Sequence, residues 1–234
     1  MNVVELLWDE RPPPRRGPRP TLTVEAIASA AIEIADAEGL AGVTMERTAR
    51  AVGVTKMAVY RYVPGKVELV ALMTDLALGD PPHPDTVTHG WRAGLDAWAR
   101  ELGVRLARHP WVLETTLGAR VLGPRELGWT ERAVAALAGT GLAGAEMLDV
   151  VATVVGHIRT MTEQATASAT GTPEQDMDTT ITALLRGRED RFPALVAALA
   201  STVAESQDQA LDFGLERILD GVELLVAARA GGSP

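Results

Sequence analysis

Residues 44–63 read TMERTARAVGVTKMAVYRYV, and this stretch decides the fold. It holds two short segments with helical spacing of apolar residues, separated by Gly53-Val54-Thr55. Thr44 and Thr55 stand where N-cap residues are expected, and Gly53 can adopt the positive φ that a sharp turn between helices requires. The second helix must end before Pro64, because the residue before a proline avoids the α region. The pattern predicts a helix-turn-helix, although an ordinary antiparallel helix hairpin fits the spacing equally well.

The two helices have one apolar side and one polar side. A small core would fix them at a steep angle, and its predicted members are Met45, Ala49, Val52, Val54, Val59 and Tyr62. With that core facing inward, the second helix turns its other side outward, and the residues predicted there are Thr55, Lys56, Met57, Ala58 and Arg61. Short side chains allow close approach to the floor of a DNA major groove, while lysine and arginine reach phosphates or guanine edges.

Helical patterns continue on both sides of this stretch. Upstream, Thr23 can cap a helix that ends near Glu38. Downstream, a helix is expected from Lys66 to about Leu78, and the stretch GDPPHPD at 79–85 then breaks the chain. Beyond this break the predicted helices lie at about 88–108, 110–118, 124–139, 144–168, 174–186, 193–204 and 207–229.

The whole pattern predicts an all-α protein, in which a three-helix head joins a larger helical bundle. Alanine and leucine are abundant in the predicted helices, β-branched alternation is scarce, and no repeat is evident. The predicted parts are an N-terminal Pro/Arg arm (1–20), a DNA-binding domain (21–66), a connecting helix (67–80) and a C-terminal helical domain (81–234).

The N-terminal segment RPPPRRGPRP, residues 11–20, is rich in proline, which removes backbone donors and fixes φ. It is predicted to be an extended arm whose Arg15, Arg16 and Arg19 enter a minor groove beside the site. A solvated leader that makes no contact with DNA is the alternative. The preceding VVELLW is predicted to form a short apolar helix that docks on the head.

Charge is divided unevenly along the chain, whose net charge is −9. Residues 11–66 hold nine basic and five acidic side chains, whereas residues 67–234 hold thirteen basic and twenty-three acidic ones. A basic segment joined to an acidic remainder is typical of a protein with a confined phosphate-binding face.

Several classes of function are not expected. The sequence has no cysteine, which excludes disulfides, a thiol nucleophile and a cysteine-based zinc site. The four histidines are scattered, and no HExxH, GxSxG or phosphate-binding glycine loop is present, so an enzyme is not expected. No apolar run approaches the length of a membrane span, and the first ten residues lack the pattern of a secretion signal. A cytoplasmic protein with no membrane association is the simplest expectation.

The run from Leu22 to Leu78 resembles the DNA-binding domain of the TetR family of bacterial regulators. The segments that carry the resemblance are AEGL (37–40), VTMERTARAVGV (43–54) and TKMAVYRYVPGK (55–66). The resemblance is closest to the tetracycline-repressor-like branch, whose heads share the YRYVPGK type of ending. Beyond Leu78 the chain is similar only in the number and character of its helices.

The resemblance implies roles for individual residues in binding DNA. Thr44 and Lys66 match family positions that meet phosphate, and Tyr60 matches an aromatic residue that touches the DNA backbone. Glu46 occupies a position where relatives offer a polar or basic contact, so the first helix of the motif is expected to contribute little. The positions that match base-facing residues of the family are Thr55, Lys56, Met57 and Ala58.

The resemblance also implies an assembly and a mode of control. A homodimer would bind a palindromic operator in double-stranded DNA, with half-sites about 34 Å apart, and a small-molecule effector would bind in the larger domain. The helices at 144–168 and 207–229 carry long apolar stripes and are candidates for a four-helix dimer interface; a purely internal core is the alternative.

Tryptophans gather between residues 88 and 130. Each supplies an apolar wall and one hydrogen-bond donor, which suits a hydrophobic or aromatic effector. The predicted pocket residues are Trp98, Trp111, Trp129, His109, His157 and Met161; ordinary core packing is the alternative for each. Neither a metal nor a cofactor is expected. The sequence thus predicts a repressor released from its operator by an effector, or, alternatively, a dimeric DNA-binding regulator without a ligand that is controlled by protein level or by a partner.

Overall fold

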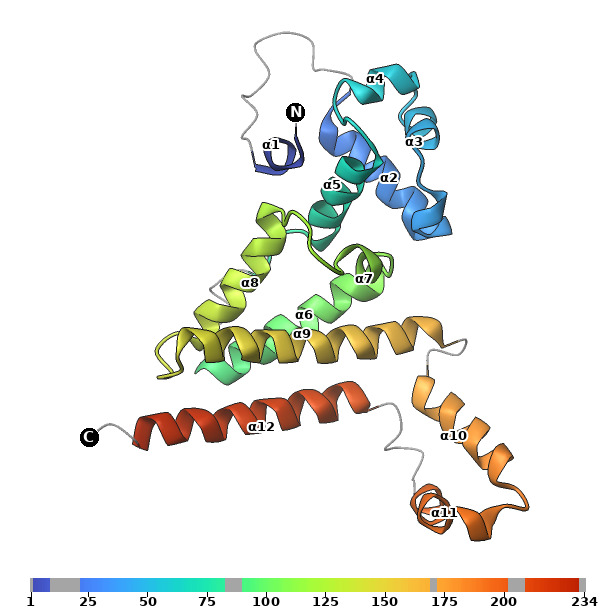
Figure 1. Ribbon diagram of the computed structural model, residues 1–234, viewed down its shortest axis with the longest axis vertical. Helices are drawn as coiled ribbons and strands as arrows, with labels where there is room; N and C mark the ends of the chain where they lie inside the picture. Colours follow the sequence, from blue (N-terminus) through green and yellow to red (C-terminus); the bar gives the residue numbers. More distant parts are fainter. Residues whose placement is uncertain (1, 9–21, 83–89, 169–171, 202–208, 232–234) are drawn as a thin grey trace. The chain divides into compact units, whose positions relative to one another are not determined.

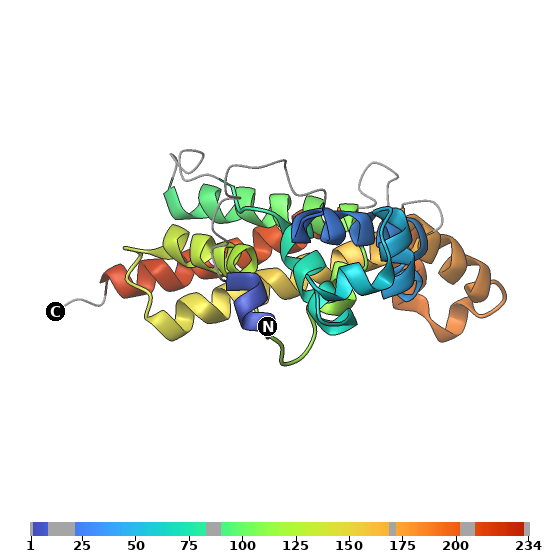
Figure 2. The ribbon, with the colours of Figure 1, turned by 90° about the horizontal axis from the view of Figure 1, so that it is seen from above.

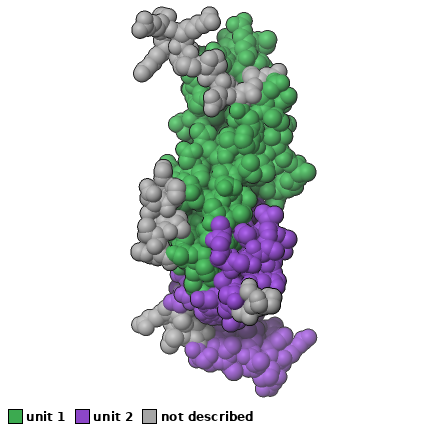
Figure 3. Space-filling model, turned by 90° about the vertical axis from the view of Figure 1, so that its left-hand side faces the viewer, with its two compact units in different colours: residues 1–137 green, residues 138–234 purple. Residues whose placement is uncertain are grey.

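The computed structural model describes residues 2–8, 22–82, 90–168, 172–201 and 209–231, and all regular elements in these ranges are helical (Figure 1; Figure 2). The predicted all-α class is confirmed. The chain forms two compact units, residues 1–137 and residues 138–234, coloured separately in Figure 3. The predicted N-terminal arm lies largely outside the described residues, with Arg16 and Arg19 among those outside.

The first unit contains the predicted helix-turn-helix and the helices around it. Helix α2 (Val24–Glu38) begins after Thr23, whose Oγ1 accepts a hydrogen bond from the Ala26 amide at 3.1 Å, and it ends at Gly39 with φ +76°. The apolar face of this helix packs on the helix that begins at Lys66. The helices of the unit are α1 (Val3–Trp8), α2 (Val24–Glu38), η1 (Leu40–Gly42), α3 (Met45–Ala51), α4 (Lys56–Tyr60), α5 (Lys66–Leu78), α6 (Gly90–Arg108), α7 (Val112–Thr115) and α8 (Pro124–Leu137).

The short N-terminal helix α1 is present and docks within this unit. Its Leu6 side chain is buried, and α1 packs on α5. The Trp8 indole N–H donates to the Leu122 carbonyl at 2.9 Å. The predicted short apolar helix is therefore confirmed.

The predicted helix at 110–118 is shorter in the structure, where α7 spans only Val112–Thr115. Gly118 turns the chain with φ +74°. The Val112 carbonyl oxygen accepts from both the Thr116 amide at 3.1 Å and Thr116 Oγ1 at 2.7 Å, so the Thr116 hydroxyl bonds back to the last turn of the helix.

The second unit is built on two long helices that lie side by side in both ribbon views (Figure 1; Figure 2). An ion pair between Glu146 and Arg229 joins them near one end. Further along, the His157 Nε2–H donates to the Leu211 carbonyl at 2.9 Å. The helices of this unit are α9 (Gly144–Ala167), α10 (Pro173–Leu185), η3 (Glu189–Arg191), α11 (Pro193–Ala200) and α12 (Ala210–Gly231). Among the described residues, no helix is both long and apolar enough to cross a membrane.

Candidate nucleic-acid interface

The turn between α3 and α4 has the geometry that the sequence predicts. Gly53 adopts φ +71°, a conformation that favours glycine. The Val54 amide bonds back to the Ala49 carbonyl at 3.0 Å, which closes the end of α3. At the two helix starts, Thr44 Oγ1 accepts from the Arg47 amide at 3.1 Å and Thr55 Oγ1 accepts from the Ala58 amide at 3.3 Å.

The small core behind this turn is only partly the predicted one. Met45, Ala49 and Val59 are buried, whereas the other three predicted members are half-buried. Two valines outside the predicted set, Val43 and Val63, are completely buried and complete the core. Helices α3 and α4 also pack on each other, and α3 packs on α2. The core therefore holds α4 from one side only.

The opposite side of α4 is open to solvent. Lys56, Met57 and Arg61 are exposed, while Ala58 is half-buried, so it lies at the edge of the exposed face. The Lys56 ammonium lies 5.8 Å from the centre of the Tyr60 ring, within the range of a cation–π interaction.

Charged side chains of the head fall into two groups. Arg47 pairs with Glu38 and also donates to the Gly42 carbonyl at 3.1 Å, so it joins α3 to the end of α2. The Arg47 hydrogen bond lowers the pKa of the Glu38 carboxyl below its ordinary value. Glu46 pairs with Arg50 at 3.1 Å, so its charge is balanced on its own helix.

The second group is available to a ligand. Lys56, Arg61 and Lys66 are exposed and form no ion pair with another described residue. Lys56 and Lys66 are also the two lysines of the sequence. The exposed hydroxyls of Thr44 and Thr55 use a lone pair for their caps and keep their own hydrogens for donation. An exposed side with unpaired cations and hydroxyl donors is suited to a polyanion.

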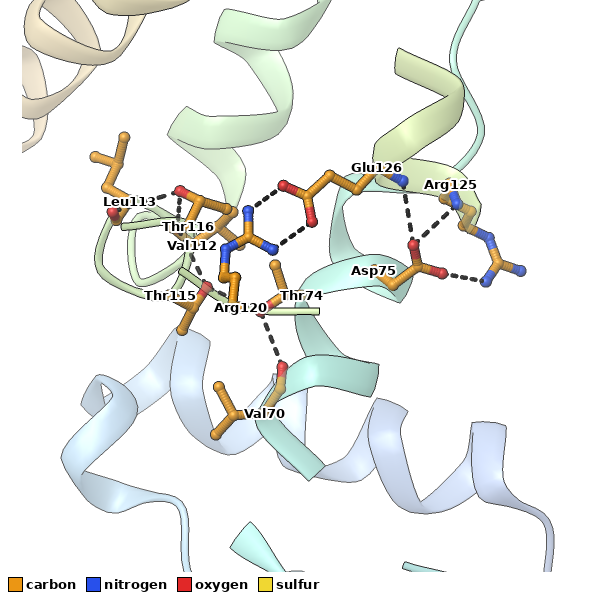
Figure 4. A network of polar contacts seen from close by, with 10 residues as sticks. All are labelled: Val70, Thr74, Asp75, Val112, Leu113, Thr115, Thr116, Arg120, Arg125 and Glu126. Carbon is orange, nitrogen blue, oxygen red and sulfur yellow. Dashed lines mark hydrogen bonds and ion pairs between the residues drawn. The ribbon is translucent and has the colours of Figure 1, made fainter. Parts of the chain in front are cut away.

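Helix α5 leads from this face to a buried polar network, shown in Figure 4. Asp75 Oδ1 accepts from the backbone amides of Arg125 and Glu126 at 2.9 and 3.1 Å, and the Arg125 guanidinium lies 3.3 Å from Oδ2. Asp75 therefore caps the start of α8. Burial raises the pKa of the Asp75 carboxyl, although these donors oppose the shift.

Two other contacts of the network involve the chain around α7. Thr74 Oγ1 on α5 lies 2.8 Å from Thr115 Oγ1 on α7, and the Arg120 guanidinium, after α7, pairs with Glu126 on α8 (Figure 4). Gly123 is required here, because a Cβ at this position would overlap the Asp75 carboxylate.

A second polar contact, here called the Asp36 joint, links α2 to the segment where α6 ends and α7 begins, called the α6–α7 corner; the Asp75 network is called the Asp75 joint. Asp36 Oδ1 accepts from the Trp111 indole N–H at 2.7 Å and from the His109 Nδ1–H at 2.8 Å. The rings of His109 and Trp111 meet edge to face with centres 6.0 Å apart. The sequence predicts these two as pocket residues, whereas in the structure their polar atoms bind a helix of the head.

The other four predicted pocket residues lie in two different places. Trp98 and Trp129 are buried with ring centres 6.1 Å apart; the Trp98 N–H donates to the Trp129 carbonyl and the Trp129 N–H to the Gly79 carbonyl, each at 3.0 Å. His157 and Met161 lie on α9 in the second unit. The pocket itself stays a prediction.

Family models cover most of the chain. Residues 22–73 match the model for bacterial regulatory proteins of the tetR family, and residues 83–226 match the model for the tetracyclin repressor-like C-terminal domain. The chain belongs to the TetR family. It is thus a DNA-binding transcription regulator, and the face of α4 described above lies within its tetR-family domain.

Two relatives of this TetR-family chain align over nearly its whole length. The HTH-type transcriptional repressor DrrR1 of Streptomyces coeruleorubidus is 37% identical over 240 residues, which cover 99% of this chain and 88% of the relative. An HTH-type transcriptional regulator of Saccharopolyspora erythraea is 28% identical over 224 residues, with 94% and 91% covered.

Solved structures share the fold. Apo ActR from Streptomyces coelicolor superposes with a TM-score of 0.76 at 22% identity and covers 92% of this chain and 100% of its own. ActR in complex with actinorhodin gives a TM-score of 0.74 at 23% identity, with 88% and 98% covered.

Proposed function

We propose that this TetR-family regulator is a dimeric repressor that binds a palindromic operator through α4 and leaves it when a small hydrophobic or aromatic effector binds. The observation that carries the DNA-binding part is the exposed side of α4, where Lys56 and Arg61 stand unpaired beside the caps at Thr44 and Thr55. A repressor role is supported by the name of the relative DrrR1.

The side chains divide between two tasks at the DNA. Lys66, at the start of α5, and the Thr44 hydroxyl would contact phosphate, which sets the register of the head on the duplex. Lys56 lies against the Tyr60 ring, and this pair would lie along the DNA backbone. Thr55, Met57, Ala58 and Arg61 would face base edges in the major groove.

The dimer would form through α9 and α12. Both helices carry large apolar side chains on the surface of the described unit: Leu148 is 55% exposed, Phe213 63% and Leu224 74%. A second copy of the chain would cover these side chains in a four-helix arrangement, because removing apolar surface from water is favourable.

Control by an effector would act through the two joints. Asp36 connects α2 to the α6–α7 corner, and Asp75 connects α5 to α8. A shift of α6–α8 would therefore move both helices that support α4, and the dimer would lose the spacing of about 34 Å between recognition helices. Support for an effector comes from the similar fold of ActR, which has been solved with actinorhodin.

The six predicted pocket residues remain the candidates for effector contact. The indole N–H groups of Trp98, Trp111 and Trp129 already donate hydrogen bonds to protein oxygens. An effector would therefore contact the faces of these rings rather than their N–H groups.

The experiment is an effector screen on the operator complex. Fluorescence anisotropy of labelled operator follows release by each compound, and tryptophan emission reports binding to the protein. We expect aromatic compounds that quench emission to release the DNA. Quenching without release, or no response from a broad library, would instead support a dimeric regulator without an effector. Lys56→Ala serves as the control that loses DNA but keeps its tryptophan response.

A further inference from the structure

The most exposed apolar side chain of α4 lies in the middle of its outward face. Met57 is 70% exposed, whereas Val59 on the opposite side of the helix is completely buried. At about 100° per residue, the exposed residues follow one another around the helix in the order Lys56, Tyr60, Met57 and Arg61. Met57 therefore projects between a lysine–tyrosine pair and an arginine.

This placement is chemically specific. An apolar side chain gains nothing from phosphate. With the Lys56–Tyr60 pair along the DNA backbone and Arg61 beside Met57 on the groove side, Met57 is left for the floor of the groove. The apolar group that the major groove of unmodified DNA presents is the C5-methyl of thymine; the other base edges offer donors and acceptors. The flexible thioether chain adapts to such a methyl without a fixed rotamer.

We infer that Met57 reads the thymine methyl, and so selects an A·T pair at one fixed position in each operator half-site. This inference rests on the proposed operator binding and adds the chemical group that is recognised. Alanine can also contact a thymine methyl, but Ala58 is half-buried at the edge of the same face, whereas Met57 is 70% exposed in its middle.

The test uses an operator obtained by selection from random DNA with the purified protein. Single thymines in it are replaced by deoxyuridine, which removes one methyl and leaves every hydrogen bond in place. Affinities are measured for the wild-type protein and for Met57→Ala, with circular dichroism to verify that the variant is folded. One symmetric pair of substitutions is expected to weaken the wild type by about fourfold per half-site, the effect of one buried methyl-sized group. Met57→Ala should bind the unmodified operator more weakly and be indifferent to that substitution.

A second arm separates the methyl from the base pair. Changing the critical thymine to cytosine should weaken wild-type binding, and 5-methylcytosine at that position should recover part of the loss; neither effect is expected with Met57→Ala. Wild-type indifference to every deoxyuridine, or equal sensitivity in both proteins, would overturn the inference while leaving operator binding intact. Failure to bind any operator would overturn both and is seen before the methyl scan begins.

Discussion

The Asp36 carboxylate on α2 accepts the Trp111 indole N–H at 2.7 Å, across 75 residues of sequence. The same oxygen accepts a hydrogen bond from the His109 Nδ1–H, so one carboxylate joins the head to the α6–α7 corner. We predict that Asp36→Ala lowers the free energy of unfolding by about 1–3 kcal/mol, because two largely buried donors are left without their acceptor. Urea denaturation at fixed protein concentration measures this.

Asp96 provides a matched control for this substitution. Its side chain is 33% exposed, as is that of Asp36, but its partner is Arg100 one turn away on the same helix. Asp96→Ala is expected to change stability by less than about 0.5 kcal/mol. Equal effects of the two substitutions would show that the Asp36 joint is an ordinary surface contact.

The two lysines permit a direct footprint of the DNA contact. We predict that saturating operator protects Lys56 and Lys66 from amine acetylation, measured by mass spectrometry, while the terminal amine serves as internal reference. Lys66→Ala should also reduce the slope of log K against log salt by about 0.9 for each phosphate that the variant no longer neutralises. If Lys66 were acetylated to the same extent with and without operator, it would not belong to the DNA interface.

Gly123 tests the cap that Asp75 forms. Gly123→Ala would place a Cβ in steric overlap with Asp75 Oδ1 and force the carboxylate off the start of α8. A loss of about 1–3 kcal/mol in unfolding free energy is expected. Gly128 on α8 is the control, since its Cβ would meet only Pro81 at 3.5 Å, and Gly128→Ala should be neutral or stabilising by up to about 1 kcal/mol. The cap would be unimportant if both variants behaved alike.

The ion pair between Glu146 and Arg229 predicts a pH dependence. Its hydrogen bond lowers the pKa of the Glu146 carboxyl below the ordinary value of 4.5. The pair therefore stabilises the fold fully above pH 4.5, and this contribution is lost as pH falls through the lower folded-state pKa. Glu146→Gln should unfold at lower urea than wild type at pH 7, and the difference should close in acid. A difference between Glu146→Gln and wild type that stays constant with pH would contradict this assignment.

The sequence contains enough local information to place most helices. Thr23, Thr44 and Thr55 all cap the helices predicted for them, and α5 has the predicted bounds of Lys66–Leu78. Capping and turn chemistry involve neighbours within a few residues, so the sequence shows both partners. The predicted outward face of α4 follows from the same local periodicity.

Long-range polar partners could not be predicted in this way. Asp36 and Asp75 look like ordinary helical acids in sequence, and their partners lie 73 to 75 and 50 to 51 residues away. The prediction of tryptophan pocket walls rests on residue type alone, and only the fold reveals which carbonyl or carboxylate takes each N–H. Val43 directly precedes the motif and Val63 is its last residue, beyond the end of α4, so helical spacing marks neither of them.

Selection from random DNA with the purified protein tests the central claim most directly. We predict enrichment of one palindrome whose half-site centres lie about one helical turn apart, bound with a steep salt dependence and not enriched by Lys56→Ala. Enrichment of no palindrome, or equal enrichment by wild type and Lys56→Ala, would contradict the assignment of the exposed side of α4 as the surface that reads DNA.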